Sequence, residues 1–265
     1  MSTHSSSVDT AKRRAVVVTP TYDERENIAD LIEAVLAEQD HVDAFELHVL
    51  VSDSHSQDGT LEIVGNLERQ NPRVHLLDVR ERGIGIGLFK GFQYAIEQLA
   101  ADVLIEMDAD FQHNPADIPA LLAKIEEGYD VVVGSRFVSG SINEMPIYRR
   151  ALSVGANQVV RSALGLTNLT EITTSFRAFT REAFLRVDPS SVPWQEKSFI
   201  FVPVFLVRML EGGARAVEVP MTMHPRMQGY SKMIYWRYIR DILAFSLSSR
   251  VGAASGSATV QKADK

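Results

Sequence analysis

The chain has 265 residues, of which 45% are apolar, and it contains no cysteine. That apolar content can bury a core, which excludes a chain disordered throughout. The lack of cysteine excludes a disulfide scaffold, Cys-ligated zinc and thiol catalysis. No apolar run reaches the ~18–20 residues of a membrane-spanning helix, and the N-terminus lacks the apolar core of a secretory signal. We therefore expect one cytoplasmic domain, with or without an appendage.

The formal net charge of −7 is distributed unevenly. Residues 1–135 carry a net charge of −15, whereas residues 136–265 carry +8. An acidic first half can hold a divalent cation, and a basic second half can hold phosphates or face an anionic membrane. The alternative is an ordinary solvated surface. No nucleic-acid partner is expected.

The first half alternates between strand and helix patterns. Apolar runs predict strands at 15–19, 46–51, 74–77, 103–107 and 131–134. Helical spacing predicts helices at 24–38, 60–69 and 87–99, and another that begins at Pro115. Strands separated by helix-length segments predict right-handed βαβ units. The expected fold class is therefore α/β, with a mainly parallel central sheet flanked by helices.

The second half has a looser pattern. We expect helices at 148–163 and, in part, at 196–211, where Pro203 interrupts the apolar run. Strands are expected at 175–179 and 216–219. The predicted organisation is a flexible tail at 1–12, one domain at 13–231, an amphipathic helix at 232–250 and a flexible tail at 251–265.

Three polar segments follow predicted strands, at 19–27, 52–59 and 108–113. Ligands of open α/β sheets bind outside the carboxyl ends of the strands. We therefore expect all three segments to lie at one edge of the sheet and to form the site.

Asp108 and Asp110 are the sharpest candidates within these segments. Two carboxylates two residues apart can place oxygens on one hard cation, and Gln112 repeats the step. Mg²⁺ or Mn²⁺ is usually held by one or two carboxylates together with substrate phosphates. The alternative is a surface turn, in which aspartate is common. The hypothesis favoured here is a metal site.

Gly83, Gly85 and Gly87 lie in the stretch ERGIGIGLFKG, which lacks the GxGxxG spacing of a dinucleotide fingerprint. One interpretation is a flexible loop whose backbone approaches a ligand. The other is an ordinary turn into a helix. The pattern leaves both open.

Basic side chains in the second half can bind phosphate oxygens. The candidates are Arg136, Arg149, Arg150, Arg177, Arg226 and Lys232. Taken singly, each is more often a solvated surface charge. The short loop at 226–232, with its glycine, serine, arginine and lysine, fits an oxyanion cradle better. His55, His75 and His113 are scattered, and we expect none of them to be a ligand.

Five segments between about residues 15 and 240 together resemble one family. They are PTYDEREN at 20–27 (PTYNEREN in the family), SDSHSQDGT at 52–60 (VDDGSPDGT), DADFQHNP at 108–115 (DADLQHPP), GSRF at 134–137 (GSRY) and RMQGYSK at 226–232 (RxxGxSK). By these motifs the chain resembles the inverting family 2 glycosyltransferases of the GT-A fold. Among them it resembles the dolichol-phosphate and polyprenol-phosphate mannose synthases.

The resemblance implies roles for the matched residues. A nucleotide-sugar donor would be bound by Pro20, Tyr22, Glu24, Asp53 and Asp108. Mg²⁺ or Mn²⁺ on the donor diphosphate would be held by Asp108, Asp110 and Gln112. The acceptor phosphate would be bound by Arg149, Arg226, Ser231 and Lys232. The residues implied to be catalytic are Asp110, Arg136, Arg226 and Lys232.

The implied activity is an inverting, metal-dependent transfer of a sugar to a polyprenyl or dolichyl monophosphate, with mannose from GDP-mannose as the expected donor. The metal neutralises charge on the leaving nucleoside diphosphate. A lipid monophosphate is already anionic, so it needs positioning and desolvation more than a strong base. Back-side attack on an α-linked donor gives a β-linked product.

The chain departs from the family pattern at three places. Ser54 stands for the second aspartate of VDDGS. In EITTSFR, which stands for DLTSGFR, Glu171, Thr174 and Ser175 replace Asp, Ser and Gly. The stretch FIFVPVF at 199–205 lacks the polar side chains of YxFQxE.

These departures leave several alternatives open. They are a UDP-sugar donor such as UDP-glucose, a different acceptor, and a non-catalytic sugar-nucleotide-binding protein. A sugar-nucleotide pyrophosphorylase is disfavoured, since the stretch TPTYDEREN has no glycine-rich loop.

The segment 233–250 combines large apolar side chains with arginines. We hypothesise that it lies on the membrane surface near the lipid acceptor, which would make the protein peripheral on the cytoplasmic face. The alternative is a helix packed on the core or against another subunit. A separate membrane-anchoring subunit and a homo-oligomer are further candidate partners.

Overall fold

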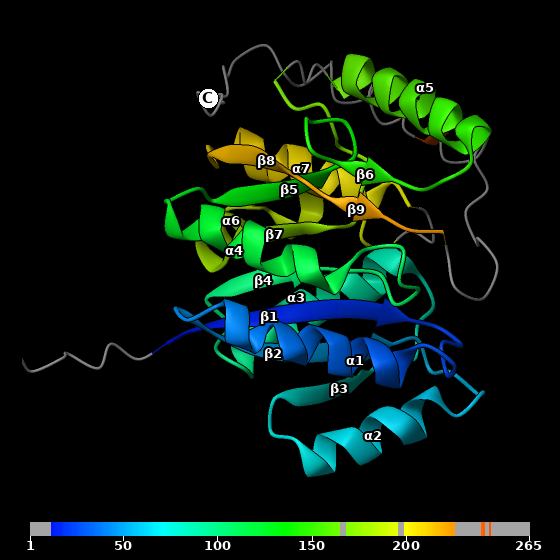
Figure 1. Ribbon diagram of the computed structural model, residues 1–265, viewed down its shortest axis with the longest axis vertical. Helices are drawn as coiled ribbons and strands as arrows, with labels where there is room; N and C mark the ends of the chain where they lie inside the picture. Colours follow the sequence, from blue (N-terminus) through cyan, green and yellow to red (C-terminus); the bar gives the residue numbers. More distant parts are fainter. Residues whose placement is uncertain (1–11, 165–167, 196–198, 226–239, 242–243, 245–265) are drawn as a thin grey trace, which may run out of the picture.

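The computed structural model describes residues 12–164, 168–195 and 199–225, together with residues 240, 241 and 244. A seven-stranded sheet runs through the molecule, and helices cover both of its faces (Figure 1). In spatial order the strands are β3 (Val74–Asp78), β2 (Phe45–Asp53), β1 (Arg13–Thr21), β4 (Val103–Glu106), β7 (Arg177–Thr180), β5 (Val131–Ser135) and β8 (Ala216–Pro220). A small second sheet pairs β6 (Ile142–Asn143) with β9 (Thr222–Met223).

All strands of the large sheet run in one direction except β7, which pairs antiparallel with β4 and β5. The expected α/β fold with a mainly parallel sheet is therefore confirmed. Strands covered on both faces read as continuous apolar runs. In β1, Val16 and Val18 pack into one core, whereas Ala15 and Val17 pack into the other.

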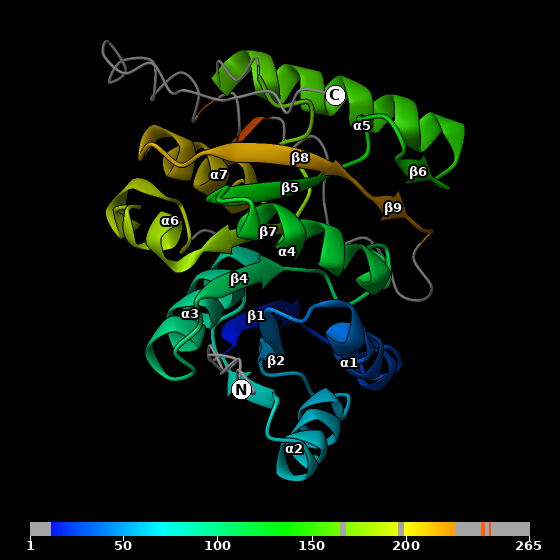
Figure 2. The ribbon, with the colours of Figure 1, turned by 60° about the vertical axis from the view of Figure 1, so that its left-hand side comes forward.

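The helices form one layer on each face of the sheet, as the turned view separates them (Figure 2). One face carries α3 (Ile84–Glu97), α6 (Arg181–Leu185) and α7 (Phe201–Glu211). The other carries α1 (Ile28–Ala37), α2 (Thr60–Gln70) and α4 (Ile118–Glu126). Short 3₁₀ turns lie at η1 (Glu38–His41), η2 (Pro115–Asp117) and η3 (Pro189–Ser191). Pro115 therefore begins the short turn η2, which leads directly into α4.

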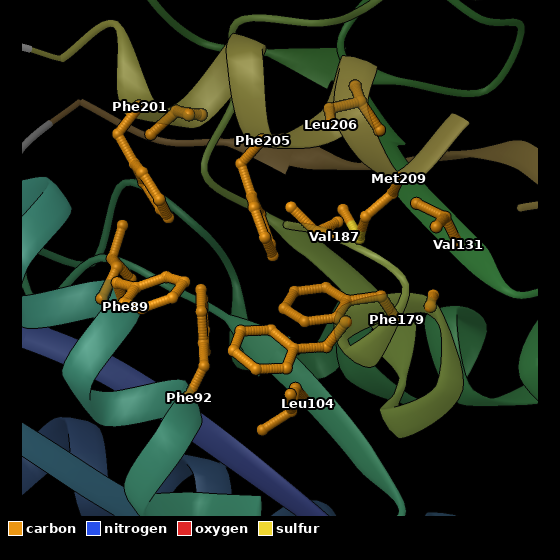
Figure 3. Close-up of a cluster of buried hydrophobic side chains, with 14 of the residues drawn as sticks. Phe89, Phe92, Leu104, Val131, Phe179, Val187, Phe201, Phe205, Leu206 and Met209 are labelled. Atoms are coloured by element: carbon orange, nitrogen blue, oxygen red, sulfur yellow. The ribbon is translucent and has the colours of Figure 1, made fainter. Parts of the chain in front are cut away.

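Phenylalanine rings fill the core between the sheet and the layer formed by α3, α6 and α7 (Figure 3). The Phe92 ring centre lies 5.0 Å from that of Phe179 and 5.8 Å from that of Phe205. Phe201 lies 5.1 Å from Phe205. The stretch at 199–205 is apolar because it packs on the sheet. The sequence suggested that Pro203 interrupts this helix, which is wrong. Pro203 lies in the first turn of α7, where backbone N–H groups have no helical partner.

The glycine-rich stretch is the beginning of a helix, so the flexible-loop interpretation is wrong. Gly83 has a φ of 154° and immediately precedes α3. Gly85 and Gly87 lie inside the helix and are buried. Gly91 lies so close to the sheet that a Cβ there would be 2.6 Å from Val18 Cγ1. Gly85, where a Cβ would be 2.9 Å from Trp194 O, and Gly91 thus allow the helix to pack closely on its neighbours.

The helix α5 (Ile147–Leu164) lies outside the two layers, next to β6 (Figures 1 and 2). Among its side chains that the structure describes, only Asn157 and Val160 are buried. No helix in the described part of the chain is long and apolar enough to cross a membrane. The predicted tails lie outside the described residues apart from residue 12, and so does the terminal helix apart from residues 240, 241 and 244. The predicted domain limits therefore stay predictions.

Candidate active site

The candidate site lies at the sheet edge where the parallel strands end. Thr21 at the end of β1 pairs with Asp53 at the end of β2. Glu106 at the end of β4 pairs with Arg177, the first residue of the antiparallel strand β7. The polar segments predicted from the sequence therefore meet at one edge. The loop before β7, residues 168–176, joins them there.

The Asp53 carboxylate is fully buried and organises the turn after β2. Its Oδ1 accepts the Ser56 N–H at 2.7 Å, and its Oδ2 accepts the hydroxyls of Thr21 at 2.8 Å and Ser56 at 2.7 Å. Such charge-assisted hydrogen bonds are strong, and they fix the turn to β1. Ser54 is also buried, and its N–H donates to Thr21 O at 2.8 Å. A contact of Asp53 with a nucleoside stays a prediction.

Tyr22 lies beside an arginine that the sequence analysis did not single out. The Arg82 guanidinium carbon is 4.1 Å from the centre of the Tyr22 ring, which is a cation–π contact. Glu24 accepts a hydrogen bond from Asn27 Nδ2 at 3.1 Å. Pro20 is half-buried in β1 just before this loop. No sequence signal pairs residue 82 with residue 22, because the contact depends on how β1 and α3 pack.

The predicted metal ligands lie together in one tight turn after β4. Asp110 is 3% exposed, and its Oδ1 accepts the Gln112 N–H at 3.0 Å. Phe111 between them has a φ of 57°, a left-handed conformation that is uncommon outside glycine. Gln112 Nε2 lies 3.7 Å from Met145 Sδ. The sharp turn therefore places Asp108, Asp110 and Gln112 at the sheet edge.

His113 supports this turn from the core. It is 2% exposed, and its ring stacks on Phe176 with centres 5.2 Å apart. Burial lowers the pKa of His113 to about 4, so the ring is neutral at pH 7. Its Nδ1 accepts the Asp108 N–H at 3.3 Å.

The oxygen ligands of this turn fit Mg²⁺ or Mn²⁺. Both cations accept carboxylate and amide oxygens, the groups that Asp108, Asp110 and Gln112 carry. The described residues contain no group of three or more His, Cys, Asp or Glu side chains that could hold a metal ion. Beyond the two aspartates and Gln112, a bound cation can take oxygens from substrate phosphates and water. That is the usual arrangement for Mg²⁺ on substrate phosphates.

Arg136 follows β5 and is held by the loop before β7. Its Nε donates to Glu171 Oε2 at 2.6 Å, and its Nη2 donates to the Thr173 hydroxyl at 2.9 Å. Burial alone raises the pKa of Glu171, but Arg136 and the Thr173 hydrogen bonds outweigh it and hold that pKa below its ordinary value. The pair is therefore ionised, and the guanidinium is fixed at the sheet edge.

A second carboxylate, Glu218 of β8, anchors the same loop. It accepts the N–H groups of Thr170 at 2.8 Å and Glu171 at 2.7 Å, and also the Thr170 hydroxyl at 2.8 Å. Asn157 of α5 accepts the Ile172 N–H at 3.1 Å and donates to Thr170 O. Sequence reasoning missed this support because its members come from distant parts of the chain.

Arg177 is buried in the core, so the expectation that it is a candidate phosphate ligand is wrong. Its Nε lies 3.3 Å from Glu106 Oε2, and both side chains are fully buried. It also donates through Nη1 to Val202 O at 2.9 Å and through Nη2 to Thr174 O. Burial raises the pKa of Glu106 to about 8, although Arg177 opposes the rise. Arg177 joins β4, β7 and α7.

Arg149 and Arg150 lie in the first turn of α5 and are exposed. The helix has three arginines and no acidic residue, so it presents positive charge to solvent. Whether Arg149 binds the acceptor phosphate stays a prediction.

Arg226, Ser231 and Lys232 lie outside the described residues. The described chain approaches their loop at His224, whose N–H donates to Gln112 O at 2.9 Å. The predicted phosphate-binding loop therefore begins two residues after a contact with the turn that carries the predicted metal ligands.

His48, His55 and His75 each contact another side chain of the protein. His48 of β2 and His75 of β3 stack with ring centres 5.2 Å apart, and burial lowers the pKa of both. His48 Nε2 lies 3.0 Å from Glu46 Oε2. His55 is paired with Asp78, its Nδ1 lying 2.9 Å from Oδ1. All three rings are thus engaged within the protein.

Fold and site together define a class of enzyme. A mainly parallel α/β sheet with paired aspartates and a fixed arginine at its carboxyl edge is the arrangement of a GT-A-type transferase that uses nucleotide sugars. The chain belongs to glycosyl transferase family 2, whose model matches residues 16–187. It is therefore a glycosyltransferase, as the sequence motifs predicted.

One curated relative is a polyprenol monophosphomannose synthase from Mycolicibacterium smegmatis. It is 35% identical over 224 residues, which cover 83% of this chain and 81% of the relative. The resemblance to polyprenol-phosphate mannose synthases is thereby confirmed.

Two solved structures share the fold at lower identity. Glucosyl-3-phosphoglycerate synthase from Mycobacterium tuberculosis, in complex with Mn²⁺, UDP and phosphoglyceric acid, has a TM-score of 0.62 at 19% identity and covers 92% of this chain and 80% of that one. A mannosyltransferase from Pyrobaculum calidifontis, in complex with GDP-mannose and Mn²⁺, has a TM-score of 0.57 at 22% identity, over 94% and 67% of the chains. Both confirm the GT-A-like fold.

Proposed function

We propose that this glycosyltransferase transfers mannose from GDP-mannose to a polyprenyl or dolichyl monophosphate, with Mg²⁺ or Mn²⁺ held by Asp108, Asp110 and Gln112. The observation that carries the proposal is the paired carboxylate turn and the fixed Arg136 at one sheet edge. It is supported by 35% identity to a polyprenol monophosphomannose synthase. A neighbour of the same fold was solved with GDP-mannose and Mn²⁺.

The residues of the site suit an anionic acceptor. A bound cation supplies neutralisation of the charge on the departing diphosphate. Arg136, oriented by Glu171, offers a fixed positive charge to a phosphate, and Arg226 and Lys232 are predicted to add two more. A lipid monophosphate carries its own negative charge at pH 7, so the protein has to align it and exclude water rather than remove a proton. In-line attack on the donor then inverts the configuration at the sugar carbon.

A transfer assay tests the proposal directly. The purified chain, GDP-[¹⁴C]mannose and Mn²⁺ are incubated with either polyprenyl phosphate or the matching polyprenol. We expect labelled lipid only with the phosphate, and a loss of at least ~100-fold for Asp110→Asn. The substitution removes a charged ligand of the cation that neutralises the developing charge, and one such stabilising group is worth about that much. The control is Lys124→Ala on α4, far from the sheet edge. Equal transfer by Asp110→Asn and the wild type would refute the metal role.

A UDP-sugar is the second candidate donor, because the chain departs from the family pattern at Ser54. Ser54 stands where the family has an aspartate, and a neighbour of the same fold was solved with UDP and phosphoglyceric acid. In the same assay, transfer from UDP-glucose, or to 3-phosphoglycerate, would replace the proposed substrates. Nucleotide binding without any transfer would favour the non-catalytic alternative.

We also propose a peripheral contact with an anionic membrane, and α5 supports it. Its exposed side chains include Ile147, Tyr148, Leu152, Val154 and Val159, beside arginines and no acid. Such a face suits an anionic interface. The segment 233–250, outside the described residues, stays a second candidate for this contact.

Co-sedimentation with phosphatidylglycerol vesicles tests this contact. Binding should fall for Leu152→Glu on α5, and separately for a chain truncated at Met233. Equal and negligible binding of all forms would refute the contact. A separate anchoring subunit and a homo-oligomer stay predictions.

A further inference from the structure

Ser175 contacts one of the two aspartates of the candidate metal site. Its hydroxyl donates to Asp108 Oδ2 at 2.8 Å, and the residue is only 8% exposed. The sheet explains why residues so far apart in sequence meet. Glu106 of β4 pairs with Arg177 of β7 in an antiparallel ladder. Asp108 lies two residues after Glu106, and Ser175 lies two residues before Arg177. Continuing the antiparallel register therefore brings Asp108 opposite Ser175, and directly opposed side chains interact.

The backbone around Ser175 is fixed on both sides. The Phe176 N–H donates to the Thr174 hydroxyl at 3.2 Å. Arg177, fully buried, donates to Thr174 O. The Ser175 hydroxyl is therefore presented to Asp108 by a rigid segment. A hydroxyl has a single hydrogen to donate, and here Asp108 receives it.

We propose that Ser175 is a positioning residue for Asp108, which orients this carboxylate for the divalent cation and thereby sets the affinity for the metal. The inference rests on the proposed function, in which Asp108 holds the cation. Carboxylates that bind metals are commonly held by a hydrogen-bond donor, and loss of that donor costs about 10–100-fold in metal affinity. The family segment DLTSGFR has glycine at this place, so the orienting hydroxyl belongs to the EITTSFR version found in this chain.

The test is calorimetric titration of Mn²⁺ into the full chain with saturating GDP. Ser175→Ala and Ser175→Gly should weaken Mn²⁺ binding by 10–100-fold, whereas Ser175→Thr, which keeps the hydroxyl, should stay within ~3-fold of wild type. In an Asp108→Asn background, Ser175→Ala should have no further effect. The matched control is Ser141→Ala. Its hydroxyl donates at the same edge of the sheet, to Ser135 O at 2.7 Å, and does not contact Asp108.

The outcomes separate this inference from the proposed function. If wild type binds Mn²⁺ with GDP and both Ser175→Ala and Ser175→Gly bind it equally well, the positioning role is refuted while the proposed function stands. If wild type itself shows no Mn²⁺-dependent binding, both are refuted. If Ser141→Ala weakens binding as much as Ser175→Ala, the effect is a general loss of packing and the inference is again overturned. Two variants at position 175 ensure that one folding failure does not end the test.

Discussion

Gly91→Ala should destabilise the fold, because it places a methyl group where the helix α3 packs on the strands β1 and β2 that carry the candidate site. Gly91 lies in the middle of α3, where the helix crosses β1 and β2. A Cβ at this position would lie 2.6 Å from Val18 Cγ1 and 3.3 Å from Ser52 Cβ. Val18 is fully buried in a strand that is paired on both sides, so it has no room to withdraw.

Two opposing effects set the magnitude. Alanine in a helix interior is favoured over glycine by about 0.5–1 kcal/mol. Carbon atoms pack at about 3.5–4.0 Å, so α3 has to move by roughly 1 Å to accommodate the methyl group. Overpacking of this kind costs about 1–3 kcal/mol. We therefore expect a net loss of about 1–2 kcal/mol in the free energy of unfolding.

Urea unfolding monitored by circular dichroism measures this effect, with Gly65→Ala as the matched control. Gly65 lies inside α2, and a Cβ there would meet only Arg69 Nη1 and Leu76 Cδ2, both at 3.9 Å. Without a clash, the control should gain about 0.5–1 kcal/mol. The two substitutions thus have opposite signs. A midpoint for Gly91→Ala at or above that of wild type would refute the packing argument.

Three further results are expected from unfolding measurements. Asp53→Ala should lower the free energy of unfolding by about 3 kcal/mol or more, because it leaves three buried donors unpaired. Asp53→Asn should lower it by only about 1 kcal/mol, since the hydroxyls of Thr21 and Ser56 can turn to accept from the amide. Equal losses for the two variants would contradict this. Burial lowers the pKa of His48 and His75 below 6.5, so the unfolded chain binds more protons in acid. The free energy of unfolding should therefore fall as the pH drops through 6.5, and it should fall less steeply in His75→Gln. An unchanged pH dependence in His75→Gln would argue against a contribution of the His48–His75 pair. Phe205→Ala should cost about 3–5 kcal/mol by opening the aromatic core, and a loss below 1 kcal/mol would show that the core closes up.

The architecture could be predicted because it depends on local patterns. The run AVVV at 15–18 is continuous because β1 is buried on both faces, and it identified a parallel strand. Because Asp53, Asp108 and Asp110 follow predicted strands, their place at the carboxyl edge of the sheet could also be predicted, while their binding of a ligand stays a prediction. The helix α1 begins only at Ile28, four residues later than expected, because Glu24 O accepts the N–H groups of Asn27 and Ile28 in a turn that precedes the helix.

What could not be predicted depends on contacts between distant residues. Arg177 was a candidate phosphate ligand because a guanidinium group suits phosphate oxygens, yet Glu106 on the neighbouring strand pairs with it in the core. Arg82 was overlooked because only the fold brings it to Tyr22. The hydrogen bond from Ser175 to Asp108 could likewise not be predicted from the sequence, since it depends on the register of β4 and β7.

The most direct test of the central claim is the metal dependence of donor binding. GDP-mannose, GDP, UDP-glucose and UDP are each titrated calorimetrically into the chain with and without Mn²⁺, and the series is repeated with Asp110→Asn. This variant keeps an oxygen that can accept the Gln112 N–H, so its fold should survive. We predict that guanosine nucleotides bind only with Mn²⁺ and that Asp110→Asn abolishes the binding. Nucleotide binding that is equally tight without Mn²⁺, or in Asp110→Asn, would contradict the account.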